Sequence, residues 1–373
     1  MKIPPFTLER YFAKHEFSAK YLLSSSDCES MRLPELLEIA SPEMRATWDN
    51  LSFGYTESQG HPLLLEEAAK CHPGLGAENL LVATPQELIF LFMEALLQPG
   101  DHVITAFPGY QSLYEIARTI GCQVSMWEPE EDANWHFDLE KLAALIRPST
   151  KLVVVNFPHN PTGYIPPQDE FDALIEMLRK KGIFLLSDEM YRFLEVNPGA
   201  TLTSACSTYE RAFSLFGMSK TFGLPGLRIG WIATRHQSTL TRMRELKDYT
   251  TICSSAPSEI LSIIALQNKE AIIADQNARV GRNLALLEKF MNTYAHIFRW
   301  NKPHGGSICF PRMLGVESTL AFADILVEEA GIMIAPSHVF DYGNQHFRIG
   351  FGRENFGEVL GTFGEYLDNK FTG

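Results

Sequence analysis

The chain has 373 residues, of which 45% are hydrophobic and 21% charged, a composition typical of a soluble globular protein. This length exceeds what one hydrophobic core usually supports, so two domains are expected. The net charge of −13 argues against a nucleic-acid partner, because phosphate backbones require a basic face.

The N-terminal residues carry charges and prolines but no apolar segment of the signal-peptide type. The longest apolar run, residues 88–97, is too short for a membrane span. The six cysteines contain no C-x-x-C pair, which favours neither a zinc site nor a disulfide framework. We therefore expect a cytoplasmic protein with no membrane partner.

From about residue 78, short apolar runs alternate with longer amphipathic ones. The apolar runs predict strands at residues 80–83, 102–107, 123–128, 151–157, 183–188, 212–218 and 228–234. The amphipathic segments predict helices at residues 85–98, 110–120, 139–146 and 168–181. Runs such as KLVVVNF are apolar on both faces, as strands covered by helices on both sides must be. This alternation predicts an α/β fold with a mostly parallel central sheet flanked by helices.

The pattern changes after residue 234, where helical periodicity continues to about residue 294. Short strands are then predicted at residues 307–310, 332–334 and 346–350, with helices at residues 319–330 and 356–369. We expect residues 46–275 to form a large domain. Residues 1–45 together with residues 276–373 are expected to form a smaller α/β domain.

Polar residues follow the predicted strands at their carboxyl ends, where ligands bind in open α/β sheets. Thr84, Pro85 and Glu87 predict a capping box at a helix start, whose free N–H groups suit a phosphate. Tyr110 follows the next strand and brings an aromatic ring to the same edge.

Further along the chain, the turn PHNPTG brings Asn160, and the strand IFLLSD ends in Asp188, with Tyr191 three residues on. Lys220 follows the strand FSLFGM, and Arg228 closes the segment GLPGLR. A carboxylate at the end of an apolar strand is unfavourable unless it meets a cation. Any one of these residues could be an ordinary loop polar, but their convergence on one edge indicates a site.

The motifs NPTG, D-x-x-Y and SKTFGLPGLRIGW occur in this order. With them the sequence resembles the class I/II aminotransferases, which are fold-type-I pyridoxal 5′-phosphate (PLP) enzymes. The resemblance extends from YTESQGHPLLLEEAAK to HFRIGFGR, almost the whole chain. It implies a large PLP-binding domain, a smaller α/β domain, PLP as the cofactor, and amino acid and 2-oxo acid substrates.

The resemblance implies a role for each residue at the sheet edge. Lys220 would hold PLP as a Schiff base and move a proton between the substrate Cα and the cofactor. Asp188 would keep the pyridine nitrogen protonated, so that the ring acts as an electron sink. Asn160 and Tyr191 would donate to the phenolic oxygen, and Tyr110 would stack on the ring. Lys220, Asp188 and Tyr191 are the predicted catalytic set.

The cofactor phosphate is expected to meet Arg228 and the helix start at Pro85 and Gln86, with Ser219 beside them. Two positions depart from the family pattern. Gly217 stands where a serine is common, and Pro85 has no N–H to donate.

Arg348, in FRIGFGR, matches the position that binds the substrate α-carboxylate, with Asn160 beside it. Tyr55 matches the position at which family members reach the phosphate of the neighbouring subunit, which implies a homodimer with shared active sites. Arg353 and Arg192 are expected to be structural.

The first hypothesis for the reaction is transamination through aldimine and ketimine intermediates. The alternative is a PLP-dependent lyase, replacement or cyclisation enzyme that starts from the same external aldimine, and product identity decides between them. A regulatory module without turnover is disfavoured, because the enzyme fold takes up the whole chain. Residues 23–30 and 249–255 are expected to shape the side-chain pocket. No metal is expected, since the loop histidines at positions 61, 159 and 304 lack metal-ligand spacing.

Overall fold

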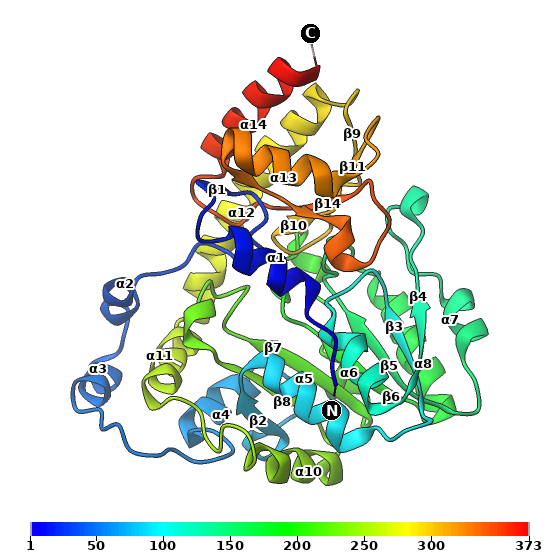
Figure 1. Cartoon of the computed structure of the whole chain (residues 1–373). Helices are drawn as coiled ribbons and strands as arrows, with labels where there is room; N and C mark the ends of the chain where they lie inside the picture. The colour runs from blue at the N-terminus through cyan, green and yellow to red at the C-terminus, as the bar shows by residue number, and fades with distance from the viewer. Residues whose placement is uncertain (1, 372–373) are drawn as a thin grey trace.

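The computed structural model describes residues 2–371, and its centre is a seven-stranded sheet (Figure 1). The strands, in the order β2-β8-β7-β6-β5-β3-β4, are Leu80–Ala83, Gly230–Ala233, Ala212–Gly217, Phe184–Asp188, Thr150–Asn156, His102–Ala106 and Gln123–Trp127. Strand β8 pairs antiparallel with β2 and β7, and all other pairs are parallel. The mostly parallel sheet predicted from the sequence is therefore confirmed.

Both faces of the sheet are covered, as the unbroken apolar runs predict. In β5, Leu152 and Val154 pack in one cluster with Leu88, whereas Val153 and Val155 pack in another with Leu174. The helices that carry these contacts, and the others around the sheet, are α4 (Pro62–Ala69), α5 (Pro85–Leu96), α6 (Ser112–Ile120), α7 (Leu139–Leu145), α8 (Gln168–Lys181), α9 (Ala205–Thr208), α10 (Gln237–Lys247) and α11 (Ala256–Gln267).

The C-terminal elements lie above the sheet in Figure 1. They include the small sheet β10-β14-β13 and the pair β9–β11. Their bounds are β9 Phe298–Arg299, β10 Ile308–Cys309, β11 Arg312–Met313, α13 Thr319–Ala330, β12 Ile332–Met333, β13 Ala335–Pro336, β14 Phe347–Gly350 and α14 Phe356–Phe371. Several of these strands have two residues, which is too short for an alternating pattern to predict.

The N-terminal segment lies with these C-terminal elements. Helix α1 (Thr7–His15) lies between them and the central sheet (Figure 1), and β1 (Tyr21–Leu22) pairs in parallel with β12. Helices α2 (Leu33–Glu38) and α3 (Pro42–Asp49) then lead toward the large sheet. The long helix α12 (Lys269–Thr293) is continuous across the domain boundary predicted at residues 275 and 276.

One predicted strand begins later than expected. Arg228 has φ +56°, a left-handed conformation that cannot continue a strand, so β8 starts at Gly230. No helix within residues 2–371 is long and apolar enough to cross a bilayer.

Candidate active site

A cavity of about 480 Å³ lies at the carboxyl ends of β5, β6 and β7. Ten of the eleven predicted site residues line it, namely Pro85, Gln86, Tyr110, Asn160, Asp188, Tyr191, Ser219, Lys220, Arg228 and Arg348. The exception is Tyr55, whose side chain is 92% exposed and does not line this cavity. The polar residues at the strand ends are therefore brought together as expected.

Lys220 lies in the wall of the cavity just after β7. Its Nζ donates a hydrogen bond to Ser26 Oγ at 2.8 Å. Enclosure by the surrounding protein lowers the pKa of the Lys220 amine below its ordinary value. A lysine with a lowered pKa has a larger share of neutral amine, which is the form that attacks an aldehyde.

Asp188 is the last residue of β6 and is buried. One carboxylate oxygen accepts from the backbone N–H of Met190 at 3.1 Å, and no residue in the described part of the chain forms an ion pair with it. Burial raises the pKa of Asp188 to about 7. A buried carboxylate that lacks an ion-pair partner is stabilised by a cation, such as the protonated ring nitrogen of a cofactor.

The raised pKa of Asp188 predicts how the cofactor-free protein responds to pH. The folded state holds a proton on Asp188 up to about pH 7, whereas the unfolded state releases it near the ordinary value of 3.8. The free energy of unfolding should therefore fall, relative to that of Asp188→Asn, by on the order of 3 kcal/mol as pH rises from about 4 to 7. Thermal or urea unfolding of both proteins across this range measures the difference, and parallel pH profiles would contradict the prediction.

The start of helix α5 faces the same cavity. Thr84 Oγ1 accepts from the backbone N–H of Glu87 at 3.2 Å, as a cap should. The second half of the predicted capping box is wrong, because the Glu87 carboxylate accepts from the hydroxyls of Thr250 and Thr251 instead. Since Pro85 has no N–H, Gln86 brings the first backbone donor at this end of the helix.

The two departures from the family pattern lie side by side. A Cβ atom added at Gly217 would be 2.8 Å from Gly230 Cα, 2.9 Å from Ile229 O and 3.4 Å from Pro85 Cγ. A Cβ added at Gly230 would be 2.7 Å from the same proline carbon. The proline ring at the helix start therefore packs on two glycines, and a serine at position 217 would have no room.

Arg348, on β14, is 1% exposed. Its Nη1 donates to Asn160 Oδ1 at 3.1 Å and its Nη2 to the Ser24 carbonyl at 2.9 Å. The guanidinium carbon also lies 5.3 Å from the ring centre of Phe340 and 5.8 Å from that of Phe12. Its Nε has no hydrogen-bond partner within residues 2–371. Arg348 is thus a fixed, buried cation with a donor left for a ligand.

Buried polar contacts also fix the loop that holds Asn160. Its backbone N–H donates to Asn156 Oδ1 at 2.8 Å, and Asn156 Nδ2 donates to the Asp188 carbonyl at 2.9 Å. The Tyr191 hydroxyl is buried in the cavity wall near Ser26. A ligand oxygen in the cavity would accept a hydrogen bond from this hydroxyl.

Several residues of the cavity wall were not predicted from the sequence. The N-terminal segment contributes Glu9, Phe12 and Glu16, which follow no strand of the large sheet. Arg353, expected to be structural, lines the cavity and pairs with Asp27 at 2.9 Å. Of the two loops expected to shape the pocket, residues 23–30 contribute Ser25, Ser26 and Asp27, and residues 249–255 contribute none.

Three other expectations concern residues outside this cavity. Arg192 is buried 4.0 Å from Glu189, which agrees with a structural role. His159 bonds Thr162 Oγ1 at 2.7 Å, and burial lowers its pKa to about 3. His61 accepts from the Leu63 N–H at the start of α4.

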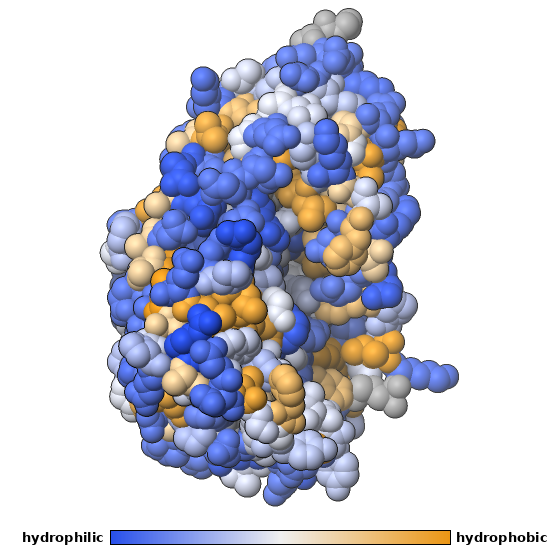
Figure 2. Space-filling view, turned by 90° about the vertical axis from the view of Figure 1, so that its left-hand side faces the viewer, coloured by the Kyte–Doolittle hydropathy of each residue, from blue (hydrophilic) through white to orange (hydrophobic). Residues whose placement is uncertain are grey.

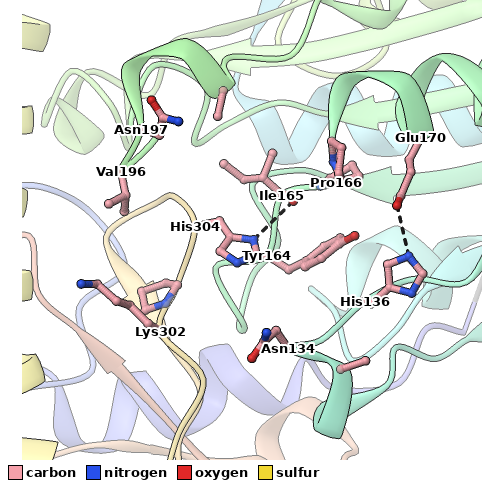
Figure 3. A pocket seen from close by; sticks show the side chains of 14 residues that line it. Asn134, His136, Tyr164, Ile165, Pro166, Glu170, Val196, Asn197, Lys302 and His304 are labelled. Atoms are coloured by element: carbon pink, nitrogen blue, oxygen red, sulfur yellow. Dashed lines mark hydrogen bonds and ion pairs between the residues drawn. The ribbon is translucent and has the colours of Figure 1, made fainter.

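A second, more open pocket of about 730 Å³ shares none of its lining residues with the Lys220 cavity (Figure 3). In it His136 bonds Glu170 at 3.1 Å, and His304 contacts the Ile165 carbonyl at 3.4 Å. Lys302, at its edge, is paired with Glu288. The groups expected for the cofactor therefore gather in the Lys220 cavity and not in this pocket.

A family model described as aminotransferase class I and II matches residues 19–358. The chain belongs to this aminotransferase family. PLP is accordingly the cofactor of this enzyme, and the buried Asp188, the Lys220 amine and the buried Tyr191 hydroxyl are the kinds of group that fit it.

Similar proteins within the family differ in the reaction they are named for. A capreomycidine synthase from Streptomyces vinaceus is 28% identical over 352 residues, 94% of this chain and 90% of that protein. An aspartate aminotransferase from Sulfolobus acidocaldarius is 28% identical over 300 residues, covering 76% of this chain and 73% of the relative.

Solved structures divide in the same way. A PLP-dependent aminotransferase from Streptococcus suis 89-1591 superposes with a TM-score of 0.92 at 30% identity, covering 99% of both chains. The PLP-dependent cyclase OrfR superposes with a TM-score of 0.90 at 27% identity, covering 99% of this chain and 98% of that one.

Proposed function

We propose that this enzyme transfers an amino group between an amino acid and a 2-oxo acid. One observation carries the proposal. The Lys220 amine, the Asp188 carboxylate and the Arg348 guanidinium line a single cavity of about 480 Å³. This arrangement supports binding of an amino acid by its carboxylate beside an amine that can take its Cα proton.

The side chains would act as follows. When bound, PLP withdraws electrons from the substrate Cα, so that its proton becomes acidic. Lys220 would carry that proton away from Cα, and its lowered pKa favours the neutral amine that acts as a base. Asp188 would hold a proton on the ring nitrogen, and Tyr191 would donate a hydrogen bond from its buried hydroxyl to the phenolic oxygen.

The remaining residues would position the two ends of the bound molecules. Gln86, Ser219 and Arg228 lie together on the cavity wall and would hold the phosphate. Arg348, already fixed by Asn160 and the Ser24 carbonyl, would bind the α-carboxylate through its remaining donors.

A second candidate function is cyclisation, elimination or replacement on an amino acid. Two full-length relatives favour it, the capreomycidine synthase and the cyclase OrfR, which match 94% and 99% of this chain. Both candidates share the residues around Lys220, so the fate of the substrate distinguishes them.

Single-turnover incubation of the holoenzyme with one amino acid and no oxo acid tests this. A transaminase leaves one equivalent of oxo acid and an aminated cofactor, which a 2-oxo acid then converts back. Continuous release of ammonia or of a cyclic product, with the starting absorbance regained, would assign the second function.

We also propose a homodimer with shared active sites. Phe53, Tyr55 and Tyr249 are 87%, 92% and 91% exposed, and exposed aromatic side chains in one region are typical of an interface. Their segments lie side by side, because Thr56 Oγ1 donates to the Ser254 carbonyl at 3.3 Å. On the face that includes α2 and α3, hydrophobic side chains gather beside a hollow (Figure 2).

If Tyr55 reaches a partner's phosphate, Tyr55→Phe should weaken PLP binding about tenfold, because one hydrogen bond to a charged group is lost. Equilibrium dialysis of PLP measures the change, and analytical ultracentrifugation gives the oligomeric state. Tyr366→Phe is the matched control, since the Tyr366 hydroxyl bonds Glu329 far from this region. A monomer, or unchanged PLP affinity in Tyr55→Phe, would refute the shared site.

The division into residues 46–275 and residues 1–45 with 276–373 is likewise proposed. The parallel pairing of Tyr21 with Ile332 supports joining the N-terminal segment to the C-terminal part. Helix α12 would then connect the two domains as a continuous element.

A further inference from the structure

Three carboxylates from the N-terminal segment line the Lys220 cavity, namely Glu9 on α1, Glu16 at its C-cap and Asp27. Asp27 is paired with Arg353 at 2.9 Å, and Glu9 accepts from the Tyr110 hydroxyl at 2.7 Å. The half-buried Glu16 carboxylate has neither a hydrogen bond nor an ion pair with any residue from 2 to 371. This wall therefore holds two carboxylates that no described cation neutralises.

The charges of the cavity do not balance once its expected ligands are counted. Four cations line it, Lys220, Arg228, Arg348 and Arg353. Under the proposed function Arg228 meets the phosphate, Arg348 meets the substrate carboxylate, and Lys220 is taken up by the cofactor. Arg353 already belongs to Asp27 and lies 3.8 Å from Glu29 as well. No cation of the described wall is left for Glu9 and Glu16.

The surroundings of Glu16 disfavour the negative charge of its carboxylate. Burial raises the pKa of Glu16, and the neighbouring charges of Asp27 and Glu9 raise it further. Arg353 and Lys220 act in the opposite direction with smaller effects. Like charges held together in a partly enclosed wall are relieved when a cation binds between them.

A second, independent feature points to a ligand in this same cavity. Arg348 Nε is buried and lacks a partner in the described chain, so one carboxylate-binding donor waits at the cavity. Among the described residues of the wall, no further arginine is free for another carboxylate, because Arg353 is paired and Arg228 is expected to meet the phosphate. Apart from the expected phosphate site at Arg228, the cavity thus has one group that binds an anion, Arg348, and a wall that favours a cation.

We propose that the substrate is an amino acid whose side chain ends in a cation, an amine or a guanidinium, which Glu16 and Glu9 bind. This rests on the proposed function, because Arg348 must bind the α-carboxylate of the same molecule. Preference for a cationic side chain comes from pairing with the two carboxylates, and discrimination against acidic side chains comes from like-charge repulsion.

Binding to holoenzyme that has been reduced with borohydride tests the inference without turnover. Calorimetry should give a dissociation constant for L-arginine about tenfold or more below that for L-citrulline, its neutral analogue of the same shape. The same order is expected for L-lysine against L-norleucine. The ratio should shrink as salt is raised, since salt screens the attraction.

Glu16→Gln keeps the shape of the side chain and removes its charge. It should lower the L-arginine to L-citrulline affinity ratio about tenfold. Glu328→Gln, an exposed change on α13, should leave the ratio as in the wild type. Consumption of the same amino acids by unreduced holoenzyme should follow the same order.

Two outcomes of the binding experiment would overturn the inference. One is equal or tighter binding of L-citrulline or L-glutamate than of L-arginine in the wild type, which needs no variant to fold. The other is an unchanged ratio in folded Glu16→Gln. If unreduced holoenzyme consumes neutral or acidic amino acids in their place, the proposed function stands and only this inference fails. If it consumes no amino acid of any charge, both fail.

Discussion

Lys220→Ala is expected to lower kcat/KM by at least about 10⁴-fold, because the variant loses both the imine-forming amine and the proton carrier at Cα. The wild-type amine lies in the cavity wall with a lowered pKa, hydrogen-bonded to Ser26. Steady-state kinetics measure the loss of activity. Borohydride reduction followed by peptide mass spectrometry should place the cofactor on Lys220 in the wild type and on no lysine in the variant.

Lys302→Ala is the control for this experiment, since Lys302 lies in the pocket of Figure 3 and pairs with Glu288. It should retain both the cofactor label on Lys220 and the activity. A reducible imine that persists in folded Lys220→Ala would assign the cofactor to another lysine.

Arg348→Lys should lower kcat/KM for amino acids by about 10²- to 10³-fold, mainly through KM. Lysine keeps the charge but cannot present the planar pair of donors that fits a carboxylate. It also loses the contacts that hold Asn160 and the Ser24 carbonyl in place. Kinetics with an amino acid and with the corresponding amine, which lacks the carboxylate, separate these effects.

The loss should be large for the amino acid and small for the amine, if carboxylate binding is the role of Arg348. Arg299→Lys, at an exposed position of β9 where the arginine pairs with Asp132, is the matched control and should change kcat/KM for neither substrate. Equal losses for amino acid and amine would show that Arg348 supports only the structure of the loop.

The residues at the sheet edge could be predicted because their positions follow from local patterns. Each strand of the large sheet is an apolar run, and parallel strands place their carboxyl ends on one edge. Asp188 therefore had to lie near Asn160 and Lys220, whatever the details of the loops. In the structure all three residues line the same cavity.

The acidic part of the cavity wall, formed by Glu9 and Glu16, could not be predicted in this way. Glu9 and Glu16 reach the cavity only because the N-terminal segment folds back, with β1 pairing to β12 more than 300 residues later. A short pair of two-residue strands leaves no periodic pattern in the sequence. Arg353 was expected to be structural, and its position in the cavity wall could not be predicted because its partner Asp27 is distant in sequence.

The packing at the start of α5, where the phosphate is expected, could not be predicted for another reason. Gly217 and Pro85 are 132 positions apart in the chain and read as two separate departures. In the structure the proline ring fills the space beside the glycine, so each accommodates the other. Packing between distant residues, and not a local preference, explains this pair.

The groups expected to bind PLP and the carboxylates proposed to bind the substrate side chain lie in different parts of the chain, which has an evolutionary consequence. The groups expected to bind PLP lie mostly at or just after strands of the large sheet, whereas Glu9 and Glu16 belong to one short terminal segment that β1 and the Glu9–Tyr110 contact help to attach. Substitutions at Glu16 would therefore alter which side chain is accepted without disturbing the reaction centre, whereas Ser24 and Ser26 of the same segment bond Arg348 and Lys220. New substrate ranges within such a lineage would then arise first at its amino terminus.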